Sequence, residues 1–177
     1  NLTVARQTTS ATSNSVKGYS LGGLISSVAQ TNKQFVTIST TGNATDFGNL
    51  GGPGGQGAAT SNAHGGLTDG YQGTRPATFL NSGDQGIAMG GSGSTAIDKF
   101  KISQTGNTTN FGTLGTANLY YATGAGNETR GISAGGEDSI TAAKTNVIQY
   151  ITFSSDGNTS DFGDTLYEAN VNPIATF

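Results

Sequence analysis

The sequence predicts an all-β fold made of repeated units, and three observations support this. The stretch TGNATDFG at 41–48 returns as TGNTTNFG at 105–112 and as DGNTSDFG at 156–163. A second pattern (polar, Gly, apolar, small, apolar, Gly, Gly) occurs at 17–23, 85–91 and 130–136. Gly makes up 29 of the 177 residues and only 11% are charged. With few Pro residues and many β-branched ones, this composition indicates strands joined by tight turns rather than disorder.

Each copy of the first pattern follows a short alternating run, at 36–38, 100–102 and 151–153. Apolar residues two apart, with Thr or Lys between them, are typical of a strand with one buried face. Gly-Asn directly after such a run predicts a hairpin turn, since both residues tolerate positive φ. We expect the hairpin tips at Gly42, Gly106 and Gly157. We expect the aromatic residue of each returning strand to be buried: Phe47, Phe111 and Phe162.

The second pattern predicts another strand in each unit. Small residues flanked by glycines suit a strand whose backbone is approached closely by a neighbour, and the Gly pair would end that strand. Together the two patterns divide the chain into repeats 1–48, 49–112 and 113–163, with a partial repeat at 164–177 that restarts at Leu166. A period near 50 residues with several strands per repeat favours blades of a β-propeller or similar β repeats.

The second repeat is longer than the others. Gly86 lies 36 residues after Leu50, whereas the corresponding Leu-to-Gly distances in the other repeats are 16 and 17 residues. The insertion, 51–73, begins with a Gly-rich run and includes the single His of the chain. Because loops inserted into repeats gather on one face, we expect 51–73 to project as a surface loop and to serve binding.

Composition excludes several classes of function. Eight basic residues and a net charge of −3 argue against nucleic-acid binding, which needs a concentrated Lys/Arg patch. No run of about 18 apolar residues occurs, so no membrane insertion is expected. The chain has no Cys, which removes disulfides and thiolate metal ligands.

The Gly-Gly doublet after an apolar strand, at this period, resembles the kelch-type β-propeller blade, although the Tyr and Trp that usually follow the doublet are missing. The fuller unit, an apolar run followed by Thr-Gly-Asn-Ala-Thr-Asp-Phe-Gly, resembles repeats in structural proteins of tailed bacteriophages, especially aquatic ones. Leu2–Arg6 fits the start of that unit. The resemblance implies a virion component exposed outside the cell: a tail fibre, a tail appendage or a capsid decoration. It implies no catalytic residues.

Candidate sites are few. Asp156, Asn158 and Asp161 have the spacing of an oxygen-rich calcium loop, but the other repeats replace carboxylates while keeping Gly-Asn, which favours a turn with Asx hydrogen bonds. A single His without Cys indicates a solvated loop residue rather than a metal ligand or a triad member. We therefore predict no enzyme activity, no metal and no cofactor. The candidates for surface recognition are His64, Asp69, Tyr71, Tyr120 and Tyr121, with the tyrosines suited to stacking on sugars.

These observations lead to a non-enzymatic phage structural protein whose partners are other virion proteins, copies of itself, or a glycan of the host surface. The alternative is a secreted bacterial lectin-like or adhesin module on the same repeats. Three blades are too few for a closed propeller, which typically has 4–8, and open β repeats leave edges that invite pairing. Residues 1–48 carry a charge of +2 and residues 113–177 a charge of −5. We therefore expect head-to-tail contact and a chain that is not a monomer.

Overall fold

The computed structural model describes residues 1–14, 16–63, 83–115, 119–138 and 141–168. Within these residues the chain forms strands, turns and irregular segments, with no helix. The strands make three four-stranded antiparallel sheets and two small two-stranded ones. The prediction of an all-β fold is therefore confirmed.

Each four-stranded sheet uses strands that are close in the sequence. The first sheet contains β1 (Ser10–Ser13), β2 (Lys17–Leu21), β5 (Asn32–Thr37) and β6 (Thr45–Asn49), in that order. The second contains β7 (Ala58–Ser61), β8 (Gln85–Met89), β9 (Ala96–Lys101) and β10 (Thr109–Thr113). The third contains β12 (Thr123–Gly126), β13 (Arg130–Ala134), β15 (Val147–Thr152) and β16 (Ser160–Asp164).

The two small sheets fill the connections. One is the hairpin of β3 (Leu24–Ile25) with β4 (Val28–Ala29), and the other pairs β11 (Leu119–Tyr120) with β14 (Glu137–Asp138). The first of them interrupts the first sheet between β2 and β5, and β14 lies between β13 and β15 of the third. The β3–β4 hairpin and β14 therefore occupy the connection that follows the second strand of a sheet, whereas β11 precedes the first strand of the third sheet.

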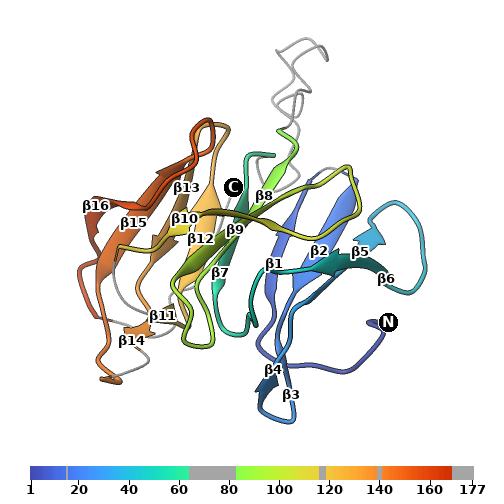
Figure 1. The fold of residues 1–177 in the computed structure, drawn as a ribbon, viewed down its shortest axis with the longest axis horizontal. Coiled ribbons are helices and arrows are strands. Elements are labelled where there is room, and N and C mark those ends of the chain that lie inside the picture. Colours follow the sequence, from blue (N-terminus) through green and yellow to red (C-terminus); the bar gives the residue numbers. More distant parts are fainter. Residues whose placement is uncertain (15, 64–82, 116–118, 139–140, 169–177) are drawn as a thin grey trace.

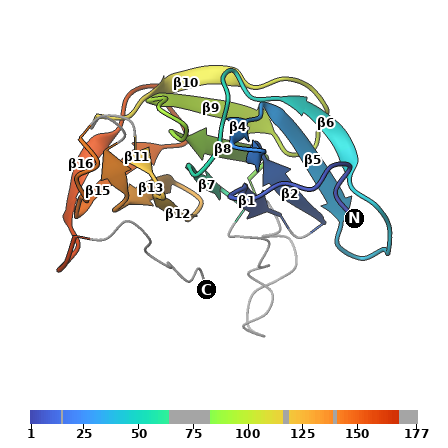
Figure 2. The ribbon, with the colours of Figure 1, turned by 90° about the horizontal axis from the view of Figure 1, so that it is seen from below.

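The three large sheets lie beside one another in chain order (Figure 1). Seen from below they form an arch, with β1, β7 and β12 on its concave side and β6, β10 and β16 on its convex side (Figure 2). Side chains join the concave strands β1 and β7: the Ser10 hydroxyl donates to the Gly57 carbonyl at 2.6 Å, and the Ser61 hydroxyl to the Ser13 carbonyl at 2.9 Å.

The strands predicted from the two sequence patterns are confirmed. The second pattern forms β2, β8 and β13. Its Gly pair ends the strand each time, and all six of those glycines have positive φ: Gly22, Gly23, Gly90, Gly91, Gly135 and Gly136. The alternating runs form the ends of β5, β9 and β15.

The Phe of each repeat sits at a β-bulge. In all three sheets the register of the outermost pair shifts at this residue, so that the Phe has no cross-strand partner. Such a bulge bends the strand and re-aims a side chain. Phe47 and Phe111 are buried as predicted, with exposed fractions of 0% and 3%. The prediction is wrong for Phe162, which is 55% exposed.

The Gly-Asn segments are not the tight turns that we predicted. The turn comes earlier, where the Thr40 amide bonds the Thr37 carbonyl and the Ser155 amide bonds the Thr152 carbonyl. Neither Gly42 nor Gly157 has positive φ. The segment after the turn is extended instead, and its backbone makes contacts outside its own sheet.

Two hydrophobic clusters lie between the sheets. The cluster between the first and second sheets is rich in aromatic rings: Tyr19, Phe35, Phe47 and Phe100 belong to it. The cluster between the second and third sheets is mainly aliphatic, with Ile87, Met89 and Ile97 beside Phe111 and Phe153. The second sheet is thus buried on both faces.

The prediction that 51–73 projects as a loop is wrong for its described part. Residues 58–61 form β7, which is buried on both faces, and Ala63 is buried beyond it. The Gly-rich run before β7 packs against the first sheet, where Gly54 accepts a hydrogen bond from the Gly23 amide and donates one to the Gln30 carbonyl. Residues 64–73 lie outside the described residues.

Candidate interaction surfaces

The same backbone contact joins the first sheet to the second and the second to the third. The Gly106 amide donates to the Phe47 carbonyl at 3.0 Å, and the Gly157 amide donates to the Phe111 carbonyl at 2.8 Å. The extended Gly-Asn segment of one sheet therefore lies along the bulged strand of the preceding sheet. The repeated Gly-Asn thus has a structural purpose that is not turn formation.

The Asn of the segment completes this contact. The Asn107 Oδ1 accepts from the Asn49 amide at 3.0 Å, and the Asn158 Oδ1 accepts from the Thr113 amide at 3.0 Å. At Gly48, whose φ is +113°, an added Cβ would lie 2.3 Å from the carbonyl oxygen of Gly106. Glycine is required there both by the backbone conformation and by the close approach of the next sheet.

A buried polar side chain holds the incoming connection on the second and third sheets. Asp98 Oδ2 accepts from the Gly51 amide at 2.8 Å, and Gln149 Oε1 accepts from the Gly115 amide at 2.9 Å. Each acceptor lies two residues before the alternating run, on β9 or β15. The sequence pattern does not indicate this feature, because a polar residue in a strand gives no periodic signal.

The two apolar residues of each alternating run receive the Phe of the preceding sheet. Phe100 and Ile102 are buried in the cluster that contains Phe47. Ile151 and Phe153 are buried in the cluster that contains Phe111. We call these residues the receiving pair of their sheet, and the bulged Phe the inserting Phe.

The first sheet has a receiving pair with nothing inserted among the described residues. Its members, Val36 and Ile38, are 39% and 57% exposed. Val36 lies opposite Gly18, as Phe100 lies opposite Gly86 in the second sheet. The Ile38 amide bonds the Val16 carbonyl, as the Ile102 amide bonds the Asp84 carbonyl. The backbone geometry of a receiving face is therefore already formed in the first sheet.

The third sheet has an inserting Phe that no described residue receives. Phe162 keeps the ring contact within its own sheet, with Tyr150 at 5.9 Å, as Phe47 does with Phe35 at 5.5 Å. Phe47 also has Phe100 of the next sheet at 6.2 Å. Phe162 lacks a counterpart of that contact in the described part of the chain, and Leu166 and Tyr167 near it in the sequence are exposed.

Residues 1–3 contact the first sheet in the same way as residues 49–51 contact the second sheet and residues 113–115 contact the third. The Asn1 amine donates to Asn43 Oδ1 at 3.1 Å, and the Ala44 amide donates to the Asn1 carbonyl at 2.8 Å. Gln34 Oε1 accepts from the Thr3 amide at 3.2 Å, in the manner of Asp98 and Gly51.

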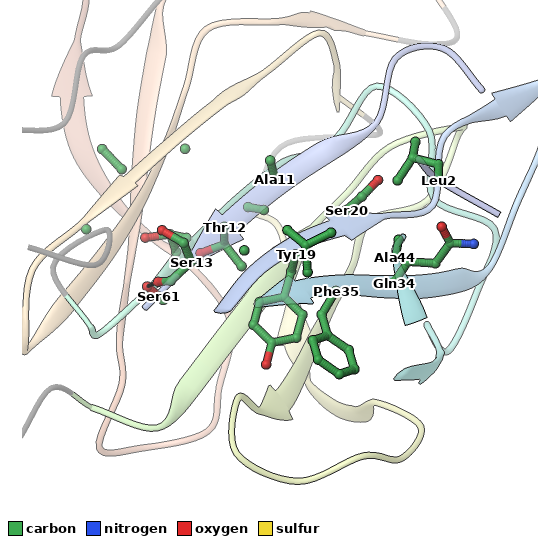
Figure 3. A pocket seen from close by; sticks show the side chains of 17 residues that line it. Leu2, Ala11, Thr12, Ser13, Tyr19, Ser20, Gln34, Phe35, Ala44 and Ser61 are labelled. Atoms are coloured by element: carbon green, nitrogen blue, oxygen red, sulfur yellow. Dashed lines mark hydrogen bonds between the residues drawn. The ribbon is translucent and has the colours of Figure 1, made fainter. Parts of the chain in front are cut away.

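A groove of about 430 Å³ runs along the concave strands (Figure 3). Its lining comes from β1, β2 and β5 of the first sheet and from β7 and β12. The labelled side chains are small, hydroxyl-bearing or apolar, apart from the amide side chain of Gln34. None of the lining residues is charged, so the groove offers hydroxyls and backbone groups rather than acid–base chemistry.

A buried lysine lies between the first two sheets. Lys33 is fully buried, with its Nζ 4.4 Å from the ring centroid of Phe100 and 5.1 Å from that of Phe47. Burial lowers the pKa of Lys33 to about 8, although the charges of Asp98 and Asp46 act in the opposite direction. The cation faces two aromatic rings, which partly compensate its desolvation.

Two other groups have shifted pKa values. Burial, with a contribution from the charge of Asp84, raises the pKa of Tyr19, whose hydroxyl donates to the Ile102 carbonyl. Burial also lowers the pKa of Arg6, whose Nη1 donates to the Gly22 carbonyl at 2.9 Å. Both groups connect parts of the fold, since Tyr19 joins the first sheet to the second and Arg6 joins the N-terminal segment to the end of β2.

Of the residues predicted for surface recognition, His64, Asp69 and Tyr71 lie outside the described residues. Tyr120 and Tyr121 lie at the end of β11, with ring centroids 6.1 Å apart. Tyr121 is 38% exposed and its hydroxyl accepts from Gln56 Nε2 at 3.1 Å.

The oxygens of the candidate calcium loop serve separate contacts. Asp156 pairs with Lys99 of the second sheet. The Asn158 amide oxygen accepts from Thr113, and Asp161 Oδ1 accepts from the Gly163 amide at 3.0 Å. In the part of the chain that the structure describes, no three His, Asp or Glu side chains are grouped as metal ligands. Of these contacts only that of Asp161 is a local Asx hydrogen bond, whereas Asn158 contacts the second sheet.

Comparison with known proteins gives no family: no protein-family model matches the sequence, and no curated protein matches it. Among the described residues there is no helix long and apolar enough to cross a membrane.

Proposed function

We propose that the chain is a non-enzymatic structural protein of a tailed-bacteriophage particle, used as a tail fibre, a tail appendage or a capsid decoration. Its three large sheets are then consecutive blades of a kelch-like β-propeller. One observation carries the proposal: a single sheet-to-sheet contact, built from Phe, Gly and Gly-Asn, occurs twice inside the chain, and its two halves are exposed on the first and third sheets.

A contact of this kind suits assembly. It joins sheets through backbone atoms and one aromatic ring, so many similar units can be added without new chemistry. The resemblance of the repeat to phage structural proteins gives the setting. In that setting the partners are other virion proteins or copies of this chain, and the particle is extracellular.

The test is to look for the chain in purified phage. Particles are banded twice in a density gradient and analysed by mass spectrometry, and antibodies against the recombinant chain are used for immunogold labelling. Peptides in the particle band and gold on tails or capsid are the expected results. Peptides confined to the bacterial culture supernatant, with unlabelled particles, would overturn the proposal.

A second candidate is a secreted lectin-like or adhesin module. The uncharged groove with its hydroxyl groups favours it, and the exposed Tyr121, which does not line the groove, offers a separate aromatic face for stacking on a sugar. A glycan array probed with wild-type protein and Tyr121→Ala tests this candidate. Binding to defined glycans that the substitution abolishes would support it, whereas an array without signal would count against it and against host-glycan binding by this chain alone.

A further inference from the structure

We propose that two copies of the chain dock end to end in both directions, so that the inserting Phe162 of each copy enters the receiving pair, Val36 and Ile38, of the other. The resulting ring contains six large sheets. This inference rests on the proposed structural function and names the partner of its exposed ends: a second copy of the same chain.

The glycine after the exposed Phe162 can be compared with the glycines at the two internal junctions. In the first and second sheets, an added Cβ at Gly48 or Gly112 would lie 2.3 and 2.0 Å from a carbonyl oxygen of the next sheet. The corresponding residue, Gly163, has a φ of +134° and no described atom within 4 Å of that point. The φ of Gly163 is close to that of Gly48, +113°, so the third sheet has the backbone conformation of the first junction with no described atom against it.

The first sheet offers the complementary surface. Val36 and Ile38 occupy the positions of Phe100 and Ile102, which bury Phe47. Gly42 has the position of Gly106, and at both residues an added Cβ would meet no described atom within 4 Å. The Gly42 amide is thus placed to donate to the Phe162 carbonyl of the second copy, as the Gly106 amide donates to Phe47.

Docking requires that the donor of one hydrogen bond to Asn43 is replaced. In the internal contacts, the residue after the Gly, Asn49 or Thr113, donates its amide to the Asn of the next sheet. In the first sheet, Asn1 makes that hydrogen bond with Asn43. Docking replaces Asn1 with Asp164 of the second copy, whose backbone takes over the contacts to Asn43 and Ala44.

The curvature of the arch is the reason why docking in both directions gives a closed ring. Its three sheets curve around a common concave side (Figure 2), and head-to-tail contacts form rings when their rotation closes. Two arches of three sheets give six, within the range of 4–8 known for propellers. The charges of residues 1–48 and 113–177, +2 and −5, attract across both junctions.

The test measures mass in solution with matched variants. Light scattering after gel filtration at micromolar concentration is expected to give twice the chain mass of 17.8 kDa for the wild type. Phe162→Asp and Ile38→Lys each remove one half of the contact and should each give the chain mass. Both replace exposed side chains, so circular dichroism should show folded protein in both cases.

Mixing the two variants restores the pair. One junction of the mixed ring is then wild-type, and the other places the introduced carboxylate of one copy against the introduced ammonium group of the other. The mixture should therefore again give twice the chain mass. Val28→Lys is the matched control, because Val28 is an exposed apolar residue on the β3–β4 hairpin, away from both ends. It should remain a dimer.

Three results would overturn the inference: a folded wild-type monomer, a dimer that persists in both Phe162→Asp and Ile38→Lys, or a mixture that stays monomeric. None of them bears on whether the chain occurs in phage particles, so the function and its assembly are tested separately.

Discussion

The junction of the first and second sheets and the junction of the second and third share a backbone contact but not a core. The first junction packs four aromatic rings, two of which, Phe47 and Phe100, face the buried Lys33. The second packs Ile and Met side chains around Phe111. Both keep the inserting Phe, the glycine after it and the Gly-Asn of the next sheet. The repeat is therefore defined by its backbone contact, while the remaining volume can be filled by side chains of different chemistry.

The largest difference in stability is expected between substitutions of Phe111, which the third sheet covers, and of Phe162, which no described residue covers. Phe111→Ala removes a buried ring and should lower the free energy of unfolding by about 3–5 kcal/mol. Phe162→Ala removes an exposed ring and should change it by less than about 1 kcal/mol. Urea unfolding of both variants in the Ile38→Lys background, where docking between copies is blocked, checks this. Equal losses at the two positions would show that Phe162 is already part of a core.

The glycine after the Phe gives the next contrast. Gly48→Ala and Gly163→Ala introduce a Cβ at similar positive φ, so both should show backbone strain of about 1–3 kcal/mol. Gly48→Ala also forces the Cβ against Gly106, which should add about 1–3 kcal/mol. Thermal and urea unfolding in the same background measure the difference. If the two variants lose the same free energy, the close approach of the second sheet does not restrict residue 48.

The chemical difference between the junctions should appear as a pH dependence. Lys33 has a folded pKa of about 8, below its unfolded value, so between these pKa values the unfolded state binds more protons. The free energy of unfolding should therefore rise by roughly 2 kcal/mol from pH 8 to pH 10, since one pKa unit corresponds to about 1.4 kcal/mol. Above pH 10 the raised pKa of Tyr19 acts in the opposite direction, because the unfolded tyrosine ionises first.

Lys33→Met is the matched variant for that measurement. It keeps the length of the side chain and removes the charge, so the rise between pH 8 and pH 10 should disappear. Lys144→Met, at an exposed lysine, should keep the rise. A slope that survives in Lys33→Met would mean that another group titrates in this range.

The weakest contrast concerns the Asn of each junction. Asn107→Ala removes one acceptor, for the Asn49 amide. Asn158→Ala removes the acceptor of both the amide and the hydroxyl of Thr113. Each should cost about 0.5–1.5 kcal/mol, with Asn158 at the upper end. Urea unfolding with replicate titrations resolves such differences. A neutral Asn158→Ala would show that water replaces these hydrogen bonds.

The sequence allowed the strands to be located because period-two alternation and Gly pairs are local signals. The exposure of Phe162 could not be predicted in this way, since burial of an inserting Phe depends on the receiving pair of another sheet. β7 was assigned to a loop because all four of its residues are small and buried, which leaves no alternation. Gly-Asn was interpreted as a turn because its contacts to the preceding sheet are tertiary. Of the five candidate recognition residues, only Tyr120 and Tyr121 are in the described structure.

The order of the sheets along the chain also bears on synthesis by the ribosome. β6 ends at Asn49, so the first sheet can pair its strands early, but Phe100 and Ile102, which receive Phe47, come at the end of β9 and just after it. At about 5–20 residues per second, translation leaves this ring uncovered for several seconds. The first and second sheets therefore each expose an apolar aromatic ring to solvent until the next sheet is made. Nascent chains that stall between sheets are the ones most prone to aggregate.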